Sequence, residues 1–144
     1  MKTMTRLTIA AYKEKYRIQK QRDEKLLELL EIEHKMTGLA KSGKELTPEQ
    51  QRSSKAMPHT VSPNYSDQKI LSLIERKDEI QAEIDYLDMS LRTAAKIERM
   101  PLIDQQMMHD LYHGRMTAED VADKYGYHPK SMYRHIYRVL DMLL

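Results

Sequence analysis

Basic side chains recur along the last predicted helix of this 144-residue chain. Lys130, Arg134 and Arg138 follow one another at steps of four, and no acidic residue occurs from His128 to Arg138. Residues four apart share one face of a helix, so these cations would form one charged face. Arginine reads the edge of a guanine and lysine contacts phosphate. We therefore predict a DNA-binding site consisting of Lys130, Ser131, Tyr133, Arg134, His135 and Arg138.

Local signals predict that this face belongs to a short helix, a tight turn and a longer helix at about 129–143. Thr117 is a suitable N-cap, and Gly126 suits a left-handed helix end. Pro129 suits the first position of the second helix. The apolar face of that helix is predicted at Met132, Ile136, Val139 or Leu140, and Leu143. The pattern is typical of a helix-turn-helix, whose second helix enters the major groove.

The C-terminal segment also resembles the fourth region of bacterial sigma factors. The resemblance is carried by Ile103, Met108, Leu111, Glu119 to Ala122, Tyr125-Gly126, Ser131-Met132 and Ile136 to Leu140. With the long helix before it, the arrangement is similar to small phage late-transcription regulators of the ArpU and RinA type. The resemblance implies a phage or prophage regulator that binds specific double-stranded DNA, with RNA polymerase as a further partner.

The remaining chain predicts an all-α fold, with long coiled-coil-like helices before a three-helix C-terminal unit at 100–144. Residues 1–40 read as a basic amphipathic helix, continuous from Leu7 to Leu39, because this stretch has no proline and no glycine before Gly38. Its first 25 residues hold eight basic and three acidic side chains. Such a run forms either a solvated helix face or a second surface for phosphate or RNA. Residues 41–66, rich in proline and serine, read as a flexible linker.

Residues 67–99 predict a long helix with a heptad seam, ended by Met100-Pro101. The seam comprises Ile70, Leu73, Lys77, Ile80, Ile84, Leu87, Leu91 and Ala94. It could pack on Leu26 to Met36 of the same chain or on a second chain. We favour a homodimer through residues 67–99, because paired half-sites would give one small reading head enough DNA contacts.

The composition of the chain limits which other kinds of site and which locations we expect. The chain has no cysteine, which removes disulfides and thiolate sites, and its charge of +2 names no partner. No apolar run is long enough for a membrane span or signal peptide, so we expect a cytoplasmic protein without a membrane partner, in the bacterial host if it is phage-encoded.

Two histidines, His109 and His113, are spaced like zinc ligands on one helical face. The acid that follows His109 is Asp110, which is shorter than the glutamate of zinc proteases, and no third ligand has characteristic spacing. We therefore expect no metal, no cofactor, no catalytic residue and no enzyme. Two alternatives to a regulator stay open, a DNA-packaging protein similar to a terminase small subunit and a coiled-coil protein-interaction module.

Overall fold

The structure is a computed structural model that describes the backbone of residues 1–44 and 65–144 and the side chains of residues 1–38 and 67–144. Every element in these ranges is helical, which confirms the all-α prediction. No helix in the described part of the chain combines the length and apolar character needed to cross a bilayer. Most of the predicted linker, residues 45–64, lies outside the described residues.

The chain divides into two units. Unit 1 combines Met1–Gln21 with Tyr86–Leu144, and unit 2 is Arg22–Asp85. Two long helices, α2 (Lys15–Lys44) and α4 (Tyr65–Ala94), contribute residues to both units.

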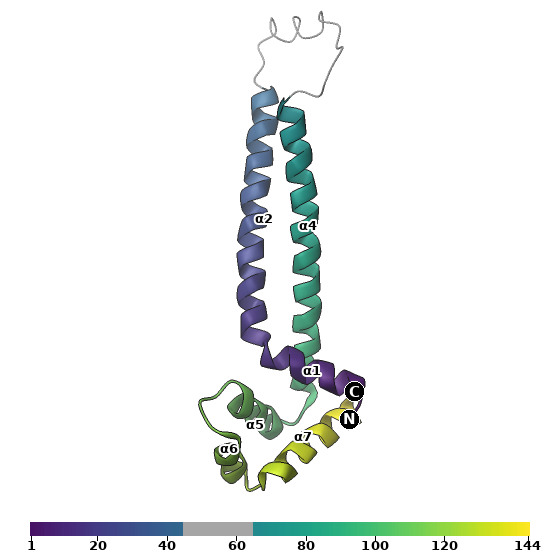
Figure 1. Ribbon diagram of the computed structural model, residues 1–144, viewed down its shortest axis with the longest axis vertical. Coiled ribbons are helices and arrows are strands. Elements are labelled where there is room, and N and C mark those ends of the chain that lie inside the picture. The colour runs from purple at the N-terminus through teal and green to yellow at the C-terminus, as the bar shows by residue number, and fades with distance from the viewer. Residues whose placement is uncertain (45–64) are drawn as a thin grey trace, which may run out of the picture. The chain divides into compact units, whose positions relative to one another are not determined.

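Unit 2 is an antiparallel helical hairpin made from α2 and α4 (Figure 1). Its core consists of Leu29, Ile32, Ile80 and Ile84, with Leu26, Met36 and Leu73 packed around them. The ammonium of Lys25 lies 2.9 Å from Glu83 Oε2, and that of Lys77, the polar seam position, lies 3.7 Å from Glu33 Oε1. Within unit 2 the heptad seam of α4 therefore packs antiparallel against α2 of the same chain.

The predicted continuous N-terminal helix is two helices in the structure. Helix α1 (Thr3–Lys13) ends at Glu14, whose φ of −95° and ψ of 3° leave the helical region, and α2 begins at Lys15. No glycine or proline stands at this break. Tertiary packing accounts for it, because α1 buries Ile9 and Tyr12 in the core of unit 1.

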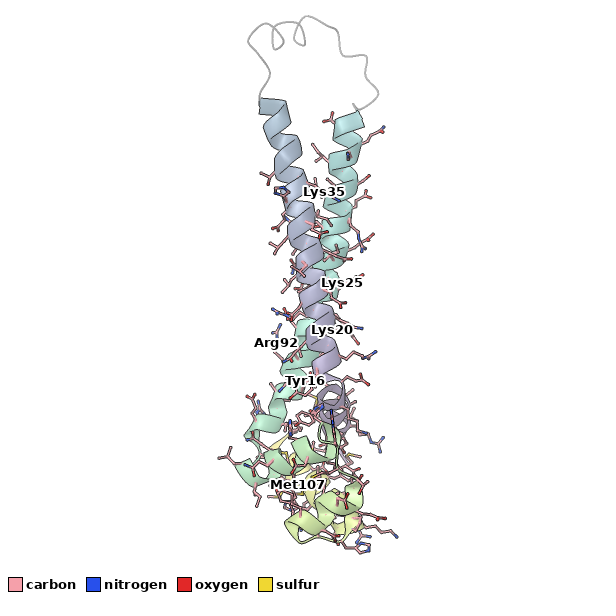
Figure 2. All side chains as sticks on the ribbon, turned by 90° about the vertical axis from the view of Figure 1, so that its left-hand side faces the viewer. Tyr16, Lys20, Lys25, Lys35, Arg92 and Met107 are labelled. Carbon is pink, nitrogen blue, oxygen red and sulfur yellow. The ribbon has the colours of Figure 1, made fainter. Side chains whose placement is uncertain are left out.

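Unit 1 surrounds a core built from the C-terminal helices and α1. After α4 come a 3-10 turn η1 (Ala95–Arg99), α5 (Leu102–Tyr112), α6 (Ala118–Tyr125) and α7 (Pro129–Leu143). The centre of the core is fully buried and includes Met107, which lies among the side chains of this unit in Figure 2. Each such side chain stabilises the fold by about 1.5–3 kcal/mol relative to an exposed one.

The sequence predicts that α5 packs through Leu102, Met107 or Met108, and Leu111, and the first of these positions is wrong. Leu102 is 76% exposed, whereas Met107 and Met108 are both fully buried. Leu102 is the first residue of α5, and the buried face of this helix begins at Asp104, one turn before Met107 and Met108. The predicted packing stripe is therefore correct at Met107, Met108 and Leu111 and wrong only at its first position.

Polar contacts hold α1 against the C-terminal helices. The carboxylate of Asp141 on α7 accepts from the Lys2 backbone N–H at 2.9 Å and from the Thr5 hydroxyl at 2.5 Å. The carbonyl of Tyr12 lies 2.7 Å from Nε2 of His113. The chain's first helix is thus an integral part of the unit that contains the predicted recognition helix.

Candidate nucleic-acid interface

The turn between α6 and α7 has the geometry that the sequence predicts. Thr117 caps α6, with its hydroxyl accepting from the Asp120 N–H at 3.2 Å. Gly126 ends α6 at φ 78° and ψ 27°, and it is the only residue with positive φ in the described part of the chain. Pro129 opens α7, and His128 Nδ1 accepts weakly from the Lys130 N–H at 3.4 Å. These caps satisfy amides that would otherwise lack partners at both helix starts.

One face of α7 packs against the core. Met132, Ile136 and Leu140 are fully buried, Val139 is half-buried and Leu143 is 39% exposed. Of the two predicted alternatives, Val139 and Leu140, Leu140 is the one that is fully buried. The apolar face ends within the last turn of the helix and leaves the remainder of its circumference to polar side chains.

The opposite face is cationic and exposed. The side chains of Lys130, Ser131, Arg134 and Arg138 are all exposed. Among the described residues, no carboxylate lies within ion-pairing distance of Lys130, Arg134 or Arg138. The acid of α7, Asp141, is turned to the N-terminal helix instead. This face therefore carries positive charge that no acid of the described chain neutralises.

An open groove of about 520 Å³ runs along this cationic face. It is lined by Tyr127, Ser131, Arg134, His135 and Arg138. Four of these five residues were predicted as DNA-binding residues, and the structure brings them together on one side of α7. Tyr127, which is outside the predicted set, is the fifth.

The His135 ring joins α7 to α5. Its Nε2 lies 2.8 Å from Oδ1 of Asp104, a carboxylate that is only 4% exposed as a residue. The Tyr127 ring stacks on the other side, at 5.3 Å between centroids and 25° between planes. Asp104 and Tyr127 thus hold the His135 ring. This arrangement suits a residue that orients α7 better than it suits a residue that contacts a DNA base.

Tyr133 lies on the other flank of α7, beside Tyr137, with 6.2 Å between ring centroids. Both are half-buried, and both lie near Tyr112 of α5. Burial raises the pKa of Tyr112 to about 12. The Lys13 ammonium of α1 lies 5.1 Å from the Tyr112 ring centroid, a cation–π arrangement. Lys13 and Tyr112 are remote from α7 along the chain, so the sequence alone does not connect them with it.

His109 on α5 and His113, the residue that caps its C-terminal end, are not arranged as a metal site. His109 and His113 have ring centroids 6.0 Å apart, but Nε2 of His113 faces the Tyr12 carbonyl. Burial lowers the pKa of His113 below its usual range. Among the described residues, no group of three or more histidine, cysteine or acidic side chains is placed to hold a metal ion.

Asp110 on α5 braces the C-terminal end of α6. Its Oδ2 accepts from the Lys124 ammonium at 2.8 Å and from the Tyr125 hydroxyl at 2.6 Å. The hydrogen bond from Lys124 is the main reason that the pKa of Asp110 lies below its usual range, with that from Tyr125 second. Asp110 is therefore a structural acceptor at the base of the turn.

No protein-family model, no curated protein and no solved structure matches this chain in sequence or fold.

Proposed function

We propose that this protein binds a specific double-stranded DNA sequence through α7 and acts as a transcriptional regulator of the phage or prophage type. The observation that carries the proposal is the exposed face of Lys130, Arg134 and Arg138, on a helix that follows a capped turn. No acid of the described residues neutralises this face. Phosphate contacts supply most of the affinity of DNA-binding proteins, and arginine at a base edge supplies specificity. The phage assignment rests on the resemblance to late-transcription regulators alone.

The geometry suggests different roles along the helix. Lys130 is in the first turn of α7, where its ammonium suits a backbone phosphate. Arg134 and Arg138 line the groove with Ser131 and suit base edges in the major groove. His135, held by Asp104 and Tyr127, orients α7 against α5.

The proposal includes two protein contacts. A second copy of the chain would place a second α7 on the DNA and supply the contacts that one small head lacks. Because Ile80 and Ile84 are already buried within unit 2, a dimer would use the outer surface of the hairpin, where Leu27 and Leu30 are 62% and 59% exposed. RNA polymerase is the proposed partner for activation, by resemblance to sigma factors.

The direct test is Arg134→Ala, with Arg99→Ala as the control because Arg99 is also exposed but lies in η1. DNA fragments selected from random sequence provide the ligand, and fluorescence anisotropy measures affinity at two salt concentrations. Arg134→Ala should weaken binding to the selected fragment about 5- to 150-fold, equivalent to about 1–3 kcal/mol, without lowering the melting temperature. Unchanged affinity for the selected fragment would refute the assignment.

Light scattering separates regulation from DNA packaging. A monomer or dimer is the expected outcome for a regulator with paired half-sites. A closed ring of many chains would favour the alternative similar to a terminase small subunit. Failure to bind any DNA at low salt, where nonspecific phosphate contacts are strongest, would favour the interaction module.

A further inference from the structure

A second groove opens within unit 1, formed by α1, the first turns of α2 and the last turns of α4. We name it the α1–α2–α4 groove. It is an open groove of about 550 Å³, and its apolar lining includes Met4, Leu7, Ala11, Ile18, Leu87 and Met89. None of these residues belongs to the cationic face of α7. The groove is therefore a separate surface, and its function does not depend on DNA binding.

The side chains that line this groove suit the apolar face of a helix. Ala10 and Ala11 are small and let a ligand approach the α1 backbone closely, while larger side chains surround them. Leu7, Tyr86 and Met89 are 52%, 68% and 61% exposed. Large apolar side chains that line one hollow of a monomer mark an interaction site more often than scattered ones do. Methionine in particular adapts its shape to a partner.

The surroundings of the groove are basic. The two charged residues that line it, Arg17 and Glu14, pair at 2.6 Å between Nε and Oε2, and the Arg17 side chain is still 66% exposed. The Lys96 ammonium lies 3.9 Å from the sulfur of Met4, at the α1 side. Lys20 follows Arg17 by three residues on α2 (Figure 2). Residues 1–21 hold six basic side chains and one acidic side chain. The net field at the groove thus favours an acidic ligand.

We propose that the α1–α2–α4 groove binds an amphipathic helix of a partner protein whose flanks carry aspartate or glutamate. The helix would place residues at i, i+3, i+4 and i+7 against Leu7, Leu87 and Met89, and its acids toward Arg17 and Lys96. A hollow fits a rounded helix, whereas a flat membrane surface would leave part of the lining uncovered. Apolar contacts supply affinity, and the charges supply selectivity and association rate.

A pair of designed peptides tests this proposal on the full-length protein. One is a helical peptide of about four turns with leucine at i, i+3, i+4 and i+7 and glutamate on its flanks. Its twin carries lysine in place of every glutamate. Fluorescence anisotropy with labelled peptides should show at least tenfold tighter binding of the glutamate peptide. Equal binding of the two peptides, or no binding of the glutamate peptide, would overturn the proposal.

Two leucine variants locate the binding surface. Leu7→Glu places an acid in the groove and should weaken binding of the glutamate peptide at least tenfold. Leu71→Glu is the matched control, since Leu71 is similarly exposed at 56% but lies in unit 2, and it should bind as the unchanged protein does. Circular dichroism verifies that both variants fold. Equal peptide affinity of the two variants would contradict the proposal. So would a protein that does not bind the peptide but binds anionic phospholipid vesicles, with binding that is lost in Leu7→Glu.

Discussion

At the scale of single residues, three side chains unite unit 1 across long stretches of sequence. His113 meets the Tyr12 carbonyl at 2.7 Å, Asp141 accepts from Thr5, and His135 faces Asp104 at 2.8 Å. Each contact joins helices that are far apart in the chain. Of the groups involved, the Asp104 carboxylate is buried, and a buried polar group that loses its partner costs about 1–3 kcal/mol.

The His113 contact predicts a dependence of stability on pH. Burial lowers the pKa of His113 from its ordinary value of 6.5, so the unfolded chain binds a proton more readily than the folded chain. Stability from this residue is complete above pH 6.5 and decreases as the pH falls through the folded pKa. His113→Gln removes the titration and keeps an N–H donor. The difference in unfolding free energy between the two proteins, from urea titrations at pH 7.5 and 5.5, should shrink at the lower pH. A difference that is constant or grows would contradict this linkage.

At the scale of elements, a glycine follows the end of α5 and another follows the end of α6, for different physical reasons. Gly126 has positive φ, a conformation that costs other residues about 1 kcal/mol or more. Gly114 does not have positive φ, but a Cβ there would lie 2.6 Å from the Asp110 carbonyl oxygen. One glycine is required by its backbone conformation and the other by the space available.

Alanine substitutions distinguish these reasons. Gly126→Ala should lower the unfolding free energy by about 1–2 kcal/mol, because alanine is strained in the left-handed region. Gly114→Ala should lower it at least as much, since the α5 backbone must shift. Gly38→Ala is the control in α2, where a Cβ meets nothing within 4 Å and alanine should stabilise the helix by about 0.5–1 kcal/mol. Thermal unfolding followed by circular dichroism measures all three, and an unaffected Gly126→Ala protein would contradict the turn geometry.

At the scale of the whole molecule, unit 1 is discontinuous in sequence. Its core takes Ile9 and Tyr12 from the N-terminal segment and Met108, Val121 and Ile136 from the C-terminal one. Burial of the two N-terminal side chains contributes roughly 3–6 kcal/mol, which is a large part of the stability of a small domain. The predicted helix-turn-helix unit therefore depends on a helix that lies more than 80 residues earlier.

Two truncated proteins test this dependence. Joining residues 1–21 to residues 86–144 through a glycine-serine linker should give a folded protein that unfolds cooperatively. Residues 86–144 alone expose the surface that Ile9 and Tyr12 cover, and should melt at a much lower temperature or not fold. Circular dichroism and differential scanning calorimetry compare them. A fragment 86–144 as stable as the joined protein would show that α1 is dispensable.

The amino-acid sequence by itself determined the local features of this protein. Thr117, Gly126 and Pro129 act within a few residues of their own positions, so the helices around the turn, the packing of Met132, Ile136 and Leu140, and the exposure of Lys130, Arg134 and Arg138 were predictable. The tertiary structure alone decided the break at Glu14, the exposure of Leu102, the closure of the heptad seam within the chain and the groove beside Leu7. Periodicity shows that a helix has an apolar face but does not show which surface covers it, because burial is non-directional and only the folded chain supplies the partner.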